Sequence, residues 1–179
     1  MPTSHYSKIP IVFNQIEQVW PFDSMLDIGP GFGKFGLVAR ERYDVRFKRY
    51  DRKDWQLKLD CVEIYGPYIT PAHEFIYNSI YIGDIYNTVA HLKDYDVVMM
   101  IDCLEHLEKK DGEKVVEALG KITKKLLIFS FPSFFKGNEG RGWPNQYELH
   151  RCLWTKEDLE AILGPVHAVN KTIFTKQFV

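Results

Sequence analysis

A glycine-rich segment near the N-terminus has the residue types and spacing of a nucleotide-binding turn. It runs from Asp27 to Gly36 and reads DIGPGFGKFG. Glycines permit a sharp turn from a strand into a helix and let the backbone approach a ligand closely. The letters GFGKFG match the G-x-G-x-x-G pattern of dinucleotide sites, whereas DIGPGFG matches an acidic-x-G-x-G-x-G loop. The glycines concerned are Gly29, Gly31, Gly33 and Gly36.

The next acidic strand end separates these two interpretations. A dinucleotide site needs an acidic residue about 20 residues beyond the glycines, at the end of a strand. That position falls in Tyr43–Asp54, which is too highly charged to be a buried strand. The first suitable run ends in Glu63, whose carboxylate can accept hydrogen bonds from both ribose hydroxyls of an adenosyl group. An adenosyl site is therefore favoured, although an insertion in a dinucleotide enzyme would mimic this spacing. Gly36 is then expected to pack between helix and sheet.

The elements that position these residues alternate between strands and helices. Apolar runs without alternation, such as Tyr95–Ile101, are typical of strands buried on both faces. The order predicts an α/β fold with a mostly parallel sheet and helices on both faces, and such sheets bind ligands beyond the carboxyl ends of their strands. The predicted strands are Ser24–Ile28, Leu59–Ile64, Ser79–Ile82, Tyr95–Ile101, Leu126–Phe131 and β-prone stretches within the tail Val166–Phe178. The predicted helices are Val12–Val19, Lys34–Glu41, Asp111–Thr123 and a helix capped by Thr155 that ends near Leu163.

Length and composition indicate a single cytoplasmic domain, residues 1–179. Hydrophobic residues make up 45% of the 179, enough for a core without disulfides or a structural metal. The net charge of −1 does not indicate a nucleic-acid or membrane partner. The three cysteines show no CxxC pair and no Cys/His ligand spacing, so reduced thiols and no metal site are predicted. We find no signal peptide and no apolar run that could span a bilayer.

Four segments together resemble class I S-adenosylmethionine-dependent methyltransferases over nearly the whole chain. They are LDIGPGFGKFG, VEIYGPY, YIGDI and YDVVMMIDCLEHLEK. The D-x-LEH-x-EK stretch, with the later NQYELH and WTKEDL segments, is similar to small bacterial and archaeal members. The resemblance implies the Rossmann-like fold of these enzymes and S-adenosylmethionine as the cofactor. It does not indicate the methyl acceptor.

The resemblance also implies a role for each matching residue. Asp27 would face the methionine amino group. Glu63 would hold the ribose, with Ile64 against the adenine, and Asp84 would accept a hydrogen bond from the adenine amino group. The other implied contacts are Gly29, Gly31 and Gly33 along the ribose and methionine, Gly83 and Ile85 beside Asp84, and Asp102 and Cys103 near the methionine and sulfonium.

Methyl transfer to a hydroxyl can require a general base, and three residues are candidates. Glu105 and His106 follow the predicted strand Tyr95–Ile101, and His150 lies in the long loop after the next strand. The alternatives are structural. Glu105 would cap the following helix, His106 would pack over the cofactor, and His150 would order its loop.

Two further segments stand out. Ser133–Leu153 is long, irregular and aromatic, and we interpret it as an active-site lid with possible hinges at Gly137, Gly140 and Gly142. Arg40–Asp54 mixes basic, acidic and aromatic residues. A phosphate- or RNA-binding patch and a solvated insertion with paired charges are both open, and the near balance of signs favours the latter.

The sequence thus predicts an enzyme that transfers a methyl group from S-adenosylmethionine to an O or N acceptor on a small molecule or glycan. Two alternatives stay open: a methyltransferase acting on RNA or protein, and a non-catalytic cofactor-binding regulatory protein. The near-neutral charge makes a nucleic-acid partner the less favoured one. The oligomeric state is not readable from the sequence.

Overall fold

A seven-stranded sheet forms the centre of the protein, with the strand order β3-β2-β1-β4-β5-β7-β6. The structure is a computed structural model that describes residues 3–134 and 145–178. Strands β1 to β5 pair in parallel, and β7 lies antiparallel between β5 and β6. The strands are β1 Ser24–Ile28, β2 Lys58–Glu63, β3 Ser79–Ile82, β4 Tyr95–Ile101, β5 Thr123–Ser130, β6 His167–Ala168 and β7 Ile173–Gln177.

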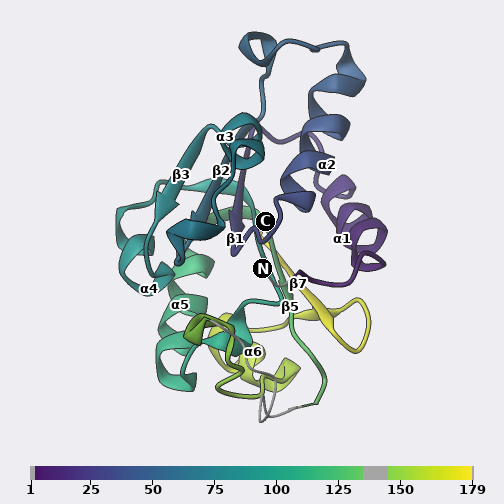
Figure 1. The fold of residues 1–179 in the computed structure, drawn as a ribbon. Helices are drawn as coiled ribbons and strands as arrows, with labels where there is room; N and C mark the ends of the chain where they lie inside the picture. Colours follow the sequence, from purple (N-terminus) through teal and green to yellow (C-terminus); the bar gives the residue numbers. More distant parts are fainter. Residues whose placement is uncertain (1–2, 135–144, 179) are drawn as a thin grey trace.

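Helices cover both faces of this sheet (Figure 1). Side chains of β1 divide between two apolar cores: Met25 joins the core under α1 and α2, and Leu26 joins the core on the opposite face. In β4, Val97 and Val98 divide in the same way, which explains why this strand shows no polar alternation. The helices are α1 Lys8–Glu17, α2 Lys34–Tyr43, α3 Pro71–Ile76, α4 Ile85–Thr88, α5 Lys109–Ile122 and α6 Lys156–Leu163.

The predicted α/β fold is confirmed, with shifts at some element ends. Three strands have their predicted bounds, and α6 has its predicted cap at Thr155, which forms a capping box with Asp158. Helix α1 starts at Lys8 rather than Val12, because Pro10 occupies the first turn, where its missing N–H is tolerated. The short helices α3 and α4 were not predicted, since six and four residues carry little periodicity.

The charged segment after the glycine loop is built as paired charges. The Arg40 guanidinium is buried and lies 2.8 Å from the Asp44 carboxylate, and Arg40 Nε donates to the Ile76 carbonyl. Arg49 also faces Asp44, at 3.5 Å. This supports the interpretation of the segment as an insertion with opposite charges paired. Across residues 3–134 and 145–178, no helix is long and apolar enough to cross a membrane.

Candidate active site

A cavity of about 540 Å³ opens at the carboxyl ends of β1, β2 and β4, where a parallel sheet is expected to bind its ligand. Its volume is in the range of a small-molecule site. Of the residues predicted from the sequence to bind the cofactor, all but Gly33 line it, and so do the three candidate bases. The predicted residues that line it are Asp27, Gly29, Gly31, Glu63, Ile64, Gly83, Asp84, Ile85, Asp102, Cys103, Glu105, His106 and His150.

The glycine loop forms one wall and depends on left-handed backbone. Gly29 and Gly31 have φ angles of +68° and +57°, a conformation that side-chain-bearing residues rarely adopt. His73 Nε2 lies 2.8 Å from the Gly31 carbonyl and fixes the loop from α3. Gly33, at φ +76°, is the N-cap of α2 and packs against His73 and Ile76. Its role is thus to form the turn, and it does not line the cavity.

Asp27 lies under the loop, almost completely buried, and its carboxylate accepts a 2.6 Å hydrogen bond from Tyr77 Oη. Burial raises the pKa of Asp27 to about 7, partly opposed by the Tyr77 hydrogen bond. Gly36 makes this arrangement possible, because a Cβ there would lie 2.4 Å from the same Tyr77 oxygen. Gly36 was predicted to pack between helix and sheet, whereas the atoms nearest to it belong to Ile76 of α3 and to Tyr77, the residue after that helix.

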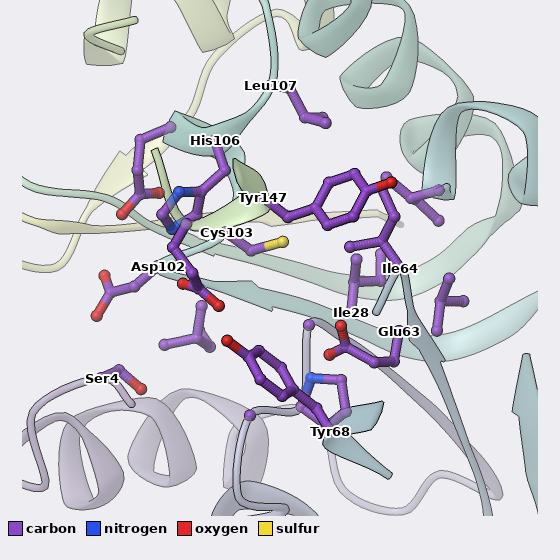
Figure 2. A pocket seen from close by; sticks show the side chains of 18 of the residues that line it. Ser4, Ile28, Glu63, Ile64, Tyr68, Asp102, Cys103, His106, Leu107 and Tyr147 are labelled. Carbon is purple, nitrogen blue, oxygen red and sulfur yellow. The ribbon is translucent and has the colours of Figure 1, made fainter. Parts of the chain in front are cut away.

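Glu63, the acidic residue that ends β2, lies across the cavity from Asp102 and His106. Figure 2 shows Glu63, Ile28 and Ile64 on one side and Asp102 and His106 on the other. Glu63 is buried, and its Oε1 accepts a 2.8 Å hydrogen bond from the Tyr65 N–H. Burial raises the pKa of Glu63. This leaves a carboxylate directed at a space large enough for a nucleoside.

Asp84 caps the helix that follows β3. Its Oδ1 accepts a 2.9 Å hydrogen bond from the Tyr86 N–H, while Gly83 and Ile85 line the cavity beside it. A cap of this kind fixes the carboxylate at the cavity edge. The cap uses Oδ1 of Asp84 and leaves Oδ2 outside it.

Asp102 follows β4 in a strained conformation and closes the floor of the cavity. Its φ is +50°, and its backbone N–H donates to the Ser130 carbonyl at 2.8 Å. Its carboxylate accepts hydrogen bonds from Lys8 Nζ and from Ser130 Oγ. Strain of this kind persists where surrounding contacts fix the residue, which is common at functional sites.

The N-terminal segment also lines the cavity, a feature that no sequence signal indicated. Thr3, Ser4 and His5 contribute to the wall. Lys34 Nζ, from α2, donates to the Ser4 carbonyl and to Thr3 Oγ1. Tyr68 lines the cavity and was missed as well, whereas Tyr147, which also lines it, belongs to the segment Ser133–Leu153 that the sequence predicted as a lid. Tyr147 approaches the aromatic ring of Tyr65, with the ring centroids 6.2 Å apart.

The three candidate bases come together at one end of the cavity. Glu105 and His106 form the 3-10 turn Leu104–His106, and the rings of His106 and His150 have centroids 5.0 Å apart. The Glu105 backbone carbonyl accepts from the Arg151 N–H at 2.8 Å, which ties the segment around His150 to this turn. The alternative that Glu105 caps the next helix is wrong, because Glu108 is the N-cap of α5.

Burial changes the acid–base properties of this cluster. It raises the pKa of Glu105 to about 8, with the Asp102 charge acting in the same direction. It lowers the pKa of His106, which is partly opposed by a hydrogen bond to the Leu149 carbonyl. Residues 135–144 of the predicted lid Ser133–Leu153, which include Gly137, Gly140, Gly142 and Trp143, lie outside the described residues.

No protein-family model and no curated protein matches the chain. The chain is, however, similar to several solved structures. An S-adenosylmethionine-dependent methyltransferase from Clostridium acetobutylicum is 14% identical, with a TM-score of 0.66 over 98% of this chain and 92% of that one. Magnesium protoporphyrin IX methyltransferase from Synechocystis, with bound SAH, is 14% identical, with a TM-score of 0.61 over 100% and 90%.

A small RNA methyltransferase is 18% identical, with a TM-score of 0.67 over 99% of this chain and 26% of that one. At these identities the likeness concerns the fold. The chain has the Rossmann-like fold of S-adenosylmethionine-dependent methyltransferases, as the sequence predicted. These neighbours act on different substrates, a magnesium porphyrin and a small RNA, and so the fold does not select an acceptor.

Proposed function

We propose that the protein binds S-adenosylmethionine in this cavity and transfers its methyl group to an oxygen or nitrogen of a small molecule or glycan. The observation that carries the proposal is the meeting of Asp27, the glycine loop and Glu63 at one cavity of about 540 Å³. These groups are the ones that a bound nucleoside with a charged amino acid tail requires. The structural neighbours with bound SAM or SAH support the same assignment.

The described residues fit such a cofactor along its whole length. The Glu63 carboxylate would accept from the two ribose hydroxyls, and the free oxygen of Asp84 from the adenine amino group. The left-handed backbone of Gly29 and Gly31 lets the chain approach the ribose and the methionine part. Asp27 would face the positive amino group, which compensates the cost of its buried charge.

When bound, the cofactor supplies a methyl group on a sulfonium, which a nucleophile displaces directly. The chain's contribution is then to orient the acceptor and to exclude water. Glu105, His106 and His150 line the same cavity and form a compact polar cluster there. We assign the handling of the acceptor and of its proton to this cluster.

A small-molecule or glycan acceptor is favoured over a nucleic acid. The chain's net charge is −1, whereas nucleic-acid binding depends on a concentration of basic side chains. Two basic residues of the charged segment, Arg40 in α2 and Arg49 after it, are engaged with Asp44. A panel of hydroxyl and amino acceptors, with an RNA oligonucleotide included, separates these classes by methyl incorporation.

Calorimetry with the purified chain tests the cofactor assignment. S-adenosylmethionine and S-adenosylhomocysteine are expected to bind with a 1:1 stoichiometry, and NAD only weakly. Tighter binding of NAD would overturn the proposal. Binding of both S-adenosyl compounds without methyl transfer to any acceptor would instead point to the non-catalytic regulatory alternative.

A further inference from the structure

The cluster of Glu105, His106 and His150 has the composition of a metal site. One ligand atom from each residue lies within 4.8 Å of the other two. A transition-metal ion bound at about 2.0–2.2 Å needs its ligand atoms about 3–4 Å apart. Small side-chain rotations therefore suffice to bring the three donors onto one ion.

Glu105 gives an independent sign of a missing cation. Its side chain is 3% exposed, and Oε2 has no hydrogen-bond partner among the described residues. A carboxylate oxygen that is buried and unpartnered is costly, and native proteins rarely leave one so. Glu105 also lines the cavity, so its side chain lies at the wall where a ligand would bind.

The tautomer of His106 is fixed in the form that binds metals. Its Nδ1 lies 3.2 Å from the carbonyl of Leu149, 43 residues along the chain. A carbonyl only accepts, so Nδ1 carries the proton and Nε2 keeps its lone pair. Metal-binding histidines commonly show this hydrogen bond from the second ring nitrogen, because it orients the ring.

We propose that Glu105, His106 and His150 bind one divalent transition-metal ion, whose open positions face the cavity and coordinate an oxygen of the methyl acceptor. Two imidazoles and one carboxylate select ions such as Zn²⁺ or Co²⁺ over Mg²⁺ or Ca²⁺, which prefer oxygen ligands. Three protein ligands leave positions open, as in catalytic rather than structural sites. No metal-ligand spacing is visible in the sequence, because only the fold brings His150 to the other two residues.

The acceptor part of this proposal rests on the proposed function. A hydroxyl bound to the ion loses its proton to solvent water more readily, as metal-bound water does. The acceptor oxygen then forms a bond to the methyl carbon while the carbon–sulfur bond breaks and its electron pair stays on sulfur. The products are a methyl ether, neutral S-adenosylhomocysteine and one proton. The proposal thus names an oxygen acceptor.

Titration of the metal-depleted full chain with Co²⁺ tests the site directly, since bound Co²⁺ gives visible absorption bands. One equivalent is expected to bind. Glu105→Gln and His150→Ala are each expected to weaken binding by about a hundredfold or more, because each removes a direct ligand. His167→Ala, which alters an exposed histidine of β6, serves as the control and should bind as the wild type does.

Calorimetry of S-adenosylhomocysteine on the same proteins keeps the two proposals distinguishable and shows that each variant is folded. Cobalt binding that is equal in the wild type and in both variants would overturn the metal site while leaving the cofactor assignment intact. Loss of cofactor binding in the wild type would contradict the proposed function without affecting the cobalt result. The acceptor claim fails if methyl transfer to an oxygen acceptor proceeds at the same rate with and without the ion.

Discussion

The two ends of the cavity are built in different ways. At the cofactor end, two carboxylates lie near the carboxyl ends of their own strands and each has a partner: Asp27 accepts from Tyr77, and Glu63 from the Tyr65 N–H. At the acceptor end, a short turn and a distant loop meet, and Glu105 Oε2 is buried without a partner among the described residues. The cofactor end is complete in itself, whereas the acceptor end has a polar requirement that only a ligand can satisfy.

This difference predicts that the two ends respond differently to substitution. Groups with internal partners define binding and stability, because removing them leaves another group unsatisfied. Groups without partners contribute to the reaction, since the free-energy cost of burying them in the free protein is recovered when the ligand or transition state is bound. Four substitutions test this division, in order of decreasing effect.

His150→Ala is expected to reduce methyl transfer by about a hundredfold or more, the range of a lost acid–base or metal-ligand function. Cofactor affinity should change by less than about twofold, because His150 lies at the acceptor end. Turnover on an identified acceptor and calorimetry measure the two quantities separately. A variant with full turnover would make His150 structural and would return the search to Glu105 and His106.

Glu63→Ala is expected to weaken S-adenosylhomocysteine binding by about 1.5–3 kcal/mol, the usual contribution of a hydrogen bond to a charged group. Glu157→Ala is the matched control, since Glu157 is an exposed residue of α6 that does not line the cavity. Calorimetry on both gives the comparison. Equal affinities would remove Glu63 from the site and would end the distinction between the two halves.

Gly36→Ala is expected to destabilise the protein by about 1–3 kcal/mol, because the added methyl group would lie 2.4 Å from Tyr77 Oη. Gly66→Ala provides the control, since a Cβ there would have no neighbour closer than 3.5 Å. Chemical denaturation measures both. Similar losses in the two variants would show that general glycine effects, rather than the packing beneath Asp27, dominate.

The smallest effect is a pH dependence of cofactor binding. Because burial raises the pKa of Asp27 to about 7, its carboxylate becomes charged only as the pH rises through neutrality. Affinity for the positively charged cofactor should then increase by up to about tenfold between about pH 6 and pH 8.

The stability of the free protein should depend on pH in the opposite direction. A folded pKa above the unfolded value of 3.8 means that Asp27 stabilises least at high pH.

Asp27→Asn isolates that contribution. The variant should bind the cofactor with little pH dependence below pH 8 and should unfold at a higher temperature than the wild type at alkaline pH. Calorimetry and thermal denaturation at several pH values measure the two effects. An unchanged pH profile of binding in the variant would assign the dependence to another group.

The cofactor end could be predicted from the sequence because its groups belong to local motifs. Asp27 and Glu63 each end an apolar run, and parallel strands bring such ends to one edge. For the acceptor end, the sequence predicted the candidate residues but not how they are arranged. The contact between Glu105 and the segment of His150 is a backbone hydrogen bond across the fold, and no local pattern encodes it.

Other features had no signal in the sequence at all. The wall formed by Thr3 and Ser4 depends on Lys34 donating to that segment from α2. Gly33 was predicted to contact the cofactor because the glycine motif does not distinguish a glycine that contacts the ligand from one that forms the turn. Only the positions of His73 and Ile76 behind it show which of the two it is.

The contact between Gly36, Tyr77 and Asp27 also limits how this sequence can diverge. Tyr77 can keep its hydroxyl on Asp27 only while position 36 has no side chain. In an alignment of relatives, the three positions should therefore change together rather than one at a time. A lineage that acquires a larger residue at position 36 should first have replaced the tyrosine, and its acidic residue at position 27 should then have a new hydrogen-bond donor.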